Sequence, residues 1–414
     1  MTDARTYGLF EAIGVEIEYM VVDRESLDVR PLADRVLEAA AGEIVDETAQ
    51  GRLSWSNELV LHVLELKTNG PAPGLDGLSD AFAADVRRID GFLEAHGARL
   101  MPTAMHPWMD PLRETVLWPH HHSAVYRAFD RIFGCRGHGW SNLQSVHLNL
   151  PFRGDDEFGR LHAAIRLVLP ILPALAASSP FVEGRATGLL DSRMEAYRTN
   201  SRMLPSVAGV VVPEAVFTRE AYEREILEPM YRDVAASDPE GILQDEFLNA
   251  RGAIARFGRG TVEIRVLDSQ ESPTADMAVA SIALAAIRRL AHGGASPLVA
   301  QQAMHEHALS RILLRTIRDA DRATIDDLAY LEALGEPPRP RDAGSLWHSL
   351  VERCIEDGLL PREETRDSAR VQIATGPLAR RLVEAVGPQP SHPRLAEVYR
   401  EVCDCLAADR RFRA

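Results

Sequence analysis

Five glutamates lie inside segments whose other residues are typical of β-strands. They are Glu16, Glu18, Glu58, Glu65 and Glu263. Glutamate is uncommon in strands, and its charge is costly to bury unless it is paired or binds a cation. If these strands are neighbours in one sheet, their polar faces converge on an anionic patch that would repel itself at neutral pH. The pattern therefore predicts a site that holds cations.

His147 and Arg265 complete the predicted site. His147 lies on the polar side of the segment SNLQSVHLNLPF, and Arg265 follows Glu263 at the two-residue spacing that puts both on one strand face. Carboxylate oxygens with one imidazole and no thiolate suit Mg²⁺ or Mn²⁺. A guanidinium group binds phosphate oxygens. Together these residues indicate phosphoryl transfer from a nucleotide.

Each of these residues also has a simpler interpretation. Alternating glutamates are common on the solvated face of an antiparallel sheet, which would account for Glu16 and Glu18 alone. His147 would be a hydrogen-bonded histidine, and Arg265 a cross-strand partner of a glutamate worth less than about 1 kcal/mol. The tract of residues 120–122, three histidines, looks like a metal-binding sequence. Three adjacent side chains cannot all face one ion on a regular element, so we interpret it as a loop feature.

Hydrophobic periodicity predicts the elements that must position these side chains. Strands are predicted over residues 14–23, 57–68, 141–152 and 261–269. In the last of these, Leu267 is expected on the same face as Glu263 and Arg265. An amphipathic helix is expected from Ser79, its predicted N-cap, to Gly97. Mostly buried helices are predicted over 155–177 and 275–291, an irregular loop over 100–122, and a hinge or linker over 336–342.

The composition describes a folded, enzyme-sized chain of 414 residues, 46% hydrophobic and 26% charged. Its longest apolar runs are shorter than the roughly 18 residues that span a bilayer, so no membrane association is expected. The net charge of −15 disfavours nucleic acid and favours a small polar ligand. The first residues carry no secretory pattern and the four cysteines form no disulfide framework, so we expect a cytoplasmic protein.

Four segments carry motifs in a fixed order. They are GVEIEYMVVD at 14–23, SVHLNL at 145–150, SSPFVEGRATGLLDSR at 178–193 and GTVEIRVLD at 260–268. Together they resemble the bacterial carboxylate–amine ligases of the second glutamate–cysteine ligase type, which share the catalytic fold of glutamine synthetase. The resemblance implies an α+β fold, with a carboxylate-lined concave face on an antiparallel sheet and helices on its other face. It implies a catalytic domain over 1–295 and a helical C-terminal region over 296–414 packed on it.

The resemblance also implies an ADP-forming ligase that uses ATP with Mg²⁺ or Mn²⁺. A substrate carboxylate would take the γ-phosphoryl group of ATP, and an amine would attack the acyl phosphate to form an amide or γ-glutamyl-type bond. The metal-binding positions would be Glu16, Glu18, Glu58, Glu65, His147 and Glu263. The catalytic residues would be Arg265 and Glu263, the nucleotide-binding residues Arg265, Arg256 and Arg251, and the substrate-binding residues Arg185, Arg193 and Asn149.

Two features depart from the pattern of that family. Glu58 and Glu65 are further apart than the family's two glutamates, so Glu58 would be a ligand only if a bulge brings it round. Ser145 stands where many relatives have a second histidine. The alternatives are a phosphotransferase of the same fold, a metal-dependent hydrolase, or a catalytically degenerate nucleotide-binding protein. Small carboxylates and amines are the expected partners, with no nucleic acid and no membrane, and self-association is a further hypothesis.

Overall fold

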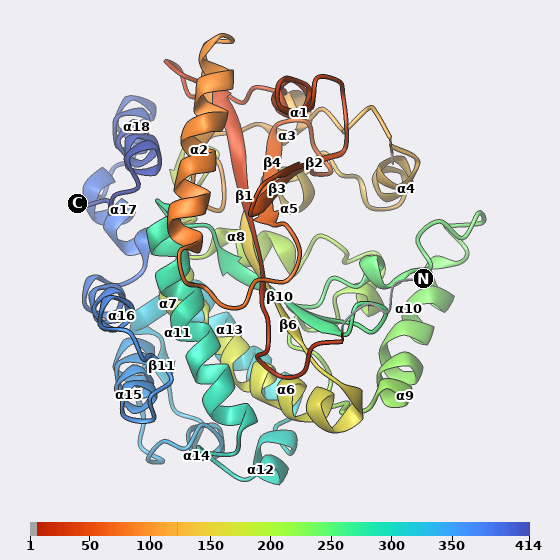
Figure 1. Ribbon diagram of the computed structural model, residues 1–414, viewed down its shortest axis with the longest axis vertical. Helices are drawn as coiled ribbons and strands as arrows, with labels where there is room; N and C mark the ends of the chain where they lie inside the picture. Colours follow the sequence, from red (N-terminus) through yellow and green to blue (C-terminus); the bar gives the residue numbers. More distant parts are fainter. Residues whose placement is uncertain (1–5, 122) are drawn as a thin grey trace.

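The computed structural model describes residues 6–121 and 123–414. The centre of the fold is one antiparallel sheet (Figure 1). The strand order is β2-β3-β4-β1-β6-β10-β9, and β5 also pairs with β1. Every pairing in this sheet is antiparallel. Its strands are β1 (Gly14–Asp23), β2 (Glu47–Gln50), β3 (Leu53–Asn57), β4 (Val63–Thr68), β5 (Ala98–Met101), β6 (Ser145–Pro151), β9 (Ala253–Arg256) and β10 (Thr261–Asp268). The predicted α+β fold is confirmed.

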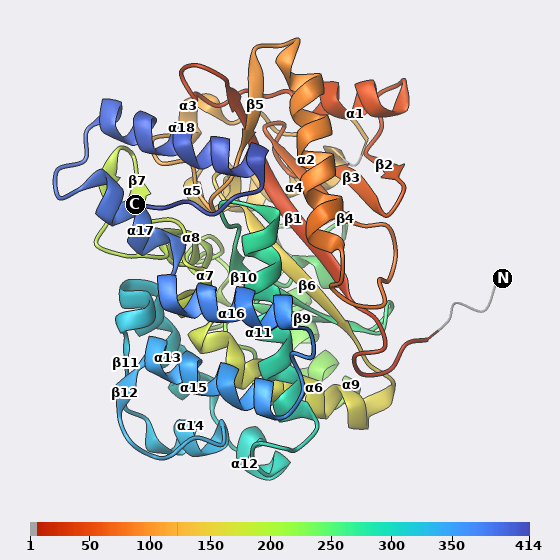
Figure 2. The same ribbon diagram turned by 60° about the vertical axis from the view of Figure 1, so that its left-hand side comes forward.

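Three long helices cover one face of this sheet. They are α2 (Leu78–Glu94), α6 (Gly154–Val168) and α11 (Pro273–Ala291), and α11 packs against both of the others. Figure 2 shows α2 and α11 crossing in front of β1 and β6. Val15, Ile17 and Tyr19 of β1 are fully buried in the same apolar core as Phe82 and Val86 of α2. Because side chains alternate along a strand, the glutamates between them face the other way.

The helix α2 confirms the predicted amphipathic helix, with a shifted start. Its apolar residues Phe82, Val86, Ile89 and Leu93 are all buried. The N-cap is Gly77, in the left-handed conformation at φ 67°, and Ser79 lies inside the helix. A glycine adopts this conformation without a steric penalty, so the turn into the helix falls before the serine.

The strand predicted over 57–68 is wrong in its first half. The chain forms β3 up to Asn57 and reverses before β4 starts at Val63, and the two strands pair with Asn57 opposite Leu64. Glu58 therefore lies in the loop between two strands. The apolar run after it does not alternate with polar residues, because it passes through this reversal rather than along a strand.

A β-bulge interrupts β10 where it pairs with β6. Ile264 lies opposite Leu148, but Leu267 lies opposite Val146, so one extra residue is inserted in β10. The bulge reverses the alternation beyond it. Leu267 joins the apolar core, and Asp268 lies opposite Ser145. The prediction that Leu267 shares a face with Glu263 is wrong for this reason.

The other elements complete the helical cover. They are α1 (Ala33–Ala41), α3 (Pro111–Glu114), α4 (Ser123–Phe133), α5 (His138–Ser141), α7 (Pro173–Ala176), the hairpin of β7 (Phe181–Val182) and β8 (Arg185–Ala186), α8 (Ser192–Tyr197), α9 (Arg219–Tyr222) and α10 (Glu228–Val234). The helix predicted over 155–177 is divided into α6, a 3-10 turn and α7, since Pro170 and Pro173 interrupt its hydrogen bonding.

The chain beyond residue 295 is mostly helical. Its elements are α12 (Leu298–Gln302), α13 (Glu306–Asp319), β11 (Thr324–Ile325), α14 (Leu328–Ala333), β12 (Arg341–Asp342), α15 (Ala343–Glu356), α16 (Glu363–Thr375), α17 (Leu378–Val386) and α18 (His392–Ala408). Within the predicted linker, Glu336 is buried between Arg341 and Arg353. Residues 337–340 that follow it are exposed, so the segment is anchored at its start and at Arg341. The domain boundary at 295 stays a prediction. None of the helices formed by the described residues is long and apolar enough to cross a membrane.

Candidate active site

The face of the sheet opposite α2 and α11 carries the acidic side chains. The register places Glu16 of β1 between Lys67 of β4 and His147 of β6, and Glu18 opposite Glu65. Glu16 and Glu18 share this face because they are two residues apart on one strand. The structure thus brings residues far apart in the sequence onto one acidic surface, as the alternation predicts.

The possible metal ligands on this surface form two groups that share Glu65. In one group the ligand atoms of Glu16, Glu65 and His147 lie within 4.8 Å of one another, and in the other those of Glu18, Glu58 and Glu65 do so. Glu58 reaches the second group from the loop between β3 and β4, so a loop rather than a bulge brings it round. Carboxylates with one imidazole are a donor set that fits a hard divalent cation.

Ser145 links the two groups. Its main-chain N–H and its hydroxyl donate to Glu18 Oε2 at 2.7 and 2.9 Å, and the hydroxyl oxygen lies 2.9 Å from His147 Nε2. His147 Nδ1 lies 3.0 Å from Glu16 Oε2. Burial disfavours the charged imidazole, but the bond to Glu16 and the charge of Glu18 raise the pKa of His147. The histidine is therefore held by Glu16 through Nδ1 and by Ser145 through Nε2, with Glu18 Oε1 4.0 Å from Nε2.

Two of the neighbouring carboxylates, Glu65 and Glu58, have raised pKa values. Burial and the charge of Glu16 raise the pKa of Glu65 to about 7. Burial, with Glu65 and Glu18 nearby, raises the pKa of Glu58 well above its ordinary value. A bound cation would favour the ionised forms and reverse this effect. The surface is therefore chemically suited to a positive ligand.

Lys67 is a site residue that the sequence reasoning missed. Its Nζ lies 3.0 Å from Glu47 Oε2, 3.1 Å from Glu65 Oε1 and 3.0 Å from Ser56 Oγ. The available signal was its position two residues after Glu65, which puts both on one strand face. Lys67 supplies a positive charge at the edge of the acidic surface.

Two of the three predicted nucleotide-binding arginines contact Glu263. Arg265 Nε lies 2.7 Å from Glu263 Oε1, and Arg256 Nε lies 3.0 Å from Oε2. Burial opposes ionisation, but the charges of Arg265 and Arg256 hold the pKa of Glu263 at about 2. Arg251 instead forms a two-pronged ion pair with Glu214, at 2.6 and 2.7 Å, and contacts none of the clustered carboxylates.

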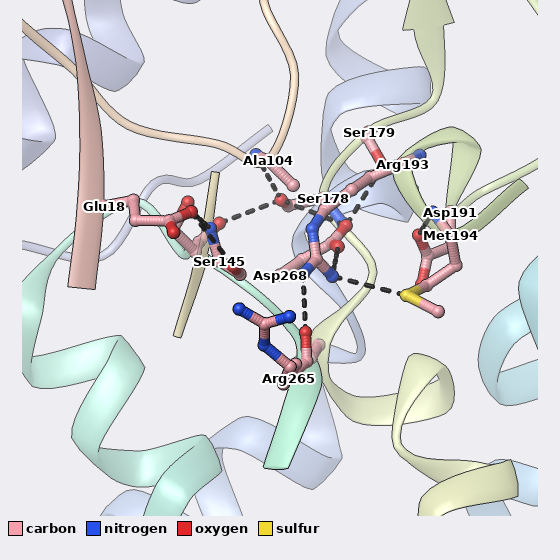
Figure 3. A network of polar contacts seen from close by, with 12 residues as sticks. Glu18, Ala104, Ser145, Ser178, Ser179, Asp191, Arg193, Met194, Arg265 and Asp268 are labelled. Atoms are coloured by element: carbon pink, nitrogen blue, oxygen red, sulfur yellow. Dashed lines mark hydrogen bonds and ion pairs between the residues drawn. The ribbon is translucent and has the colours of Figure 1, made fainter. Parts of the chain in front are cut away.

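The three predicted substrate residues occupy different environments. Asn149 Nδ2 donates to Glu16 Oε1 at 3.0 Å and so belongs to the acidic surface. Arg185 is exposed in the hairpin of β7 and β8 and, within the described chain, makes no ion pair with that surface. Arg193 is buried and forms an ion pair with Asp268 at 3.2 Å, as Figure 3 shows. Asp268 was not predicted as a partner of Arg193, because the bulge that turns its side chain toward Arg193 is not visible in the sequence.

The histidine tract lies apart from these groups. His120 Nε2 is 3.0 Å from Asp34 Oδ2, and the ring contacts Trp118. His121 is exposed, and His122 is outside the described residues. Neither His120 nor His121 belongs to a group of possible metal ligands, which agrees with the interpretation as a loop feature.

A cavity of about 590 Å³ opens beside the acidic surface. Glu16, Asn149 and Lys67 form part of its wall, and the turn between β9 and β10 forms another part. Tyr7, Ile13 and Phe257 add apolar surface. The cavity thus combines polar and apolar surface next to the charged groups, and a small polar molecule could enter it.

Comparison with known proteins places this arrangement in a class of ligases. The family described as Glutamate-cysteine ligase family 2 (GCS2) matches residues 12–398. The chain belongs to this family and is therefore an enzyme of the carboxylate–amine ligase class. It is 34% identical over 276 residues to an uncharacterized protein of Archaeoglobus fulgidus, covering 67% of this chain and 74% of that protein. It is 27% identical over 269 residues to a glutamate–cysteine ligase of Halobacterium salinarum, covering 63% of this chain and 65% of that protein.

Two solved structures share the fold. The glutamate–cysteine ligase of Francisella tularensis, in complex with AMP, has a TM-score of 0.57 and 13% identity, covering 97% of this chain and 90% of that one. The bifunctional glutathione synthetase of Pasteurella multocida has a TM-score of 0.56 and 12% identity, covering 96% of this chain and 52% of that one. At this identity the likeness establishes the fold, while the family match establishes the class.

Proposed function

We propose that the protein is an ATP-dependent, ADP-forming ligase that joins a small carboxylate to an amine. The observation that carries the proposal is that Arg265 and Arg256 both form ion pairs with Glu263. Glu263 lies on β10, which is next to β6, the strand that carries His147. A pair of arginines beside clustered carboxylates suits a phosphoryl group held by cations on one side and by guanidinium groups on the other. The AMP complex of the Francisella enzyme supports the use of a nucleotide by this fold.

The cation sites would be the two groups that share Glu65. Glu16, Glu65 and His147 would hold one ion, and Glu18, Glu58 and Glu65 a second. Their oxygen-rich donor chemistry supports Mg²⁺ or Mn²⁺. When bound, the ions would neutralise charge on the phosphate oxygens. Glu263 is engaged by two arginines, and its role as a further ligand stays a prediction.

In the proposed reaction, a carboxylate oxygen of the substrate attacks the γ-phosphorus and the bond to the β-phosphate oxygen breaks, which releases ADP. The amine then attacks the acyl carbon of the acyl phosphate, inorganic phosphate leaves, and the amine loses a proton. Arg265 would stabilise the charge on the transferring phosphoryl group. Lys67 and Asn149 line the cavity beside Glu16 and would orient the nucleotide there. The substrate pair is not assigned by any of these contacts.

The test is ATP turnover by the purified protein with Mg²⁺, using amino-acid carboxylates singly and paired with a panel of amines. ADP, phosphate and product mass are measured together. Phosphate release that requires both partners, with a product lighter than their sum by one water, would establish the ligase. A stable phosphorylated product would instead establish a phosphotransferase. Turnover without nucleotide would indicate a hydrolase, and ATP binding without any turnover would indicate a degenerate binding protein.

Location and assembly also belong to the proposal. All four cysteines are free and buried, which supports the predicted reducing, cytoplasmic environment. Self-association stays a prediction. A monomeric mass by light scattering at micromolar concentration would contradict it.

A further inference from the structure

A buried polar network connects the loop of residues 178–193 to β10 next to Arg265 (Figure 3). Arg193 is 2% exposed. Its Nη2 donates to the main-chain oxygen of Arg265 at 2.6 Å, and its Nη1 lies 3.2 Å from Asp268 Oδ1. One guanidinium group therefore fixes both ends of the stretch from Arg265 to Asp268.

Asp268 is itself anchored by the start of the same loop. Its Oδ2 accepts hydrogen bonds from the main-chain N–H of Ser178 at 2.8 Å and from the hydroxyl of Ser179 at 3.0 Å. The hydroxyl oxygen of Ser179 accepts a bond from the main-chain N–H of Arg193 at 3.1 Å. Asp268 thus ties the beginning and the end of the loop to one carboxylate, with little freedom for any member to move.

The network contacts β10 at the bulge, where the pairing of β10 with β6 is interrupted. The bulge leaves Arg265 and Val266 together opposite His147, so the regular ladder to β6 is broken there. On its other side, the main-chain N–H of Arg265 bonds to the oxygen of Gly252 at 2.9 Å, one position beyond the paired residues of β9, and its main-chain oxygen bonds to Arg193. The direction of the Arg265 side chain is therefore set by a glycine on one side and by Arg193 on the other.

We propose that Arg193 and Asp268 are positioning residues that fix the bulge of β10 and thereby hold Arg265 in place on the acidic surface. This inference rests on the proposed function, in which Arg265 acts on the transferring phosphoryl group. It assigns Arg193 a role different from the substrate contact implied by the family resemblance. With its side chain enclosed by Asp268, Met194 and the ring of Tyr197, Arg193 offers no surface to a substrate.

The test compares Arg193→Lys and Asp268→Asn with the matched control Arg381→Lys. Arg381 is also buried, and it forms an ion pair with Glu271 at 2.6 Å and donates to the main-chain oxygen of Phe412 at 2.7 Å. Misplacing a catalytic group by about 1 Å commonly costs on the order of 10²-fold in rate. We expect the first two variants to lose about 10²-fold in kcat, with the KM values for ATP and for the carboxylate changed less than about threefold. Arg381→Lys should lose a similar thermal stability and keep its kcat.

Two kinetic results would overturn the inference. A raised KM for the carboxylate at unchanged kcat would make Arg193 a substrate-binding residue. An equal loss of kcat in Arg193→Lys and Arg381→Lys would mean that the network only stabilises the fold and does not position Arg265. If Arg193→Lys does not fold, the nearly isosteric Asp268→Asn provides the test.

Crystal structures of the wild type and of these variants provide a readout without activity. The inference predicts that Arg265 moves away from Glu263, whose Oε1 lies 2.7 Å from Arg265 Nε in the wild type. An unmoved Arg265 would overturn it. If the wild-type protein consumes no ATP with any substrate pair, the proposed ligase function fails, while the crystal structures still decide whether Arg193 and Asp268 position Arg265.

Discussion

Substitution of Glu263 by glutamine should strongly reduce turnover at a moderate cost in stability. Its pKa of about 2 lies well below the ordinary value of a glutamate, because Arg265 and Arg256 favour the ionised form more than burial disfavours it. A shift of this size corresponds to about 3 kcal/mol of favourable interaction. Glu263→Gln removes that interaction and leaves two arginines without their shared carboxylate. We therefore expect a loss of about 3 kcal/mol in the free energy of unfolding and a lowered melting temperature.

Turnover should fall by about 10²-fold or more in this variant, because Arg265 loses the partner that orients it. The measurements are ATP consumption with a productive substrate pair and the thermal transition of the same preparation. Glu336→Gln is a matched control, since Glu336 is equally buried between two arginines, Arg341 at 3.1 Å and Arg353 at 2.6 Å. The control should keep its turnover. Near-normal turnover in Glu263→Gln, or an equal loss in Glu336→Gln, would refute this reasoning.

Three further outcomes follow from the same structure. Adding Mg²⁺ should raise the melting temperature of the wild type, chelation should remove the gain, and Glu65→Gln should reduce it, since Glu65 belongs to both ligand groups; an equal gain in the variant would contradict the site. Burial lowers the pKa of His106 to about 4 and of His162 to about 3. Between the pKa values of the folded state and about pH 6.5, only the unfolded chain binds protons at these two histidines. Their contribution to the free energy of unfolding should therefore be fully present above about pH 6.5 and should decrease toward pH 4. The loss at pH 5 should be on the order of 2 kcal/mol per histidine. Urea unfolding at pH 7 and pH 5 of the wild type and of His162→Gln checks this, because the carboxylates with raised pKa values, such as Glu65, act in the opposite direction equally in both proteins. The loss of stability between pH 7 and pH 5 should be smaller in the variant, and an equal loss in the two proteins would refute it. Gly252→Ala should lower the melting temperature and the turnover, because a Cβ there would lie 2.6 Å from Val266 Cγ1 at the bulge; an unchanged protein would show that the bulge can shift freely.

Period-two alternation was sufficient to predict most of the sheet. The strands around Glu16, His147 and Glu263 lie where their polar and apolar residues alternate, and their convergence on one face follows from antiparallel neighbours. The helix α2 was visible because its apolar residues recur at helical spacing. The helix α11 was visible as a long Ala-rich apolar run, and nearly all of it is buried. Local patterns of this kind are decided by nearby residues, and so a single sequence contains them.

The errors arose where distant residues decide the local structure. The segment around Leu267 alternates without interruption, and only its pairing with β6 inserts the bulge that moves Asp268 into the polar network. The partner of Arg193 is 75 positions away, and that of Arg251 is 37 positions away. Nothing in the sequence near either arginine distinguishes a buried ion pair from a ligand contact. The resemblance to relatives therefore identified the family correctly, while the environment of each arginine required the structure.

The two departures from the family pattern lie in the same part of the site. Ser145 stands where the resemblance implies a second histidine, and its hydroxyl and main-chain N–H both bond to Glu18 Oε2. Glu18 Oε2 therefore accepts two hydrogen bonds from Ser145. Glu18 nevertheless belongs to the group of possible metal ligands with Glu58 and Glu65. A serine at this position orients a carboxylate where a histidine would supply a nitrogen. In the proposed function, the oxygen of Glu58 from the neighbouring loop would complete an all-carboxylate group, and such a group would favour a hard cation.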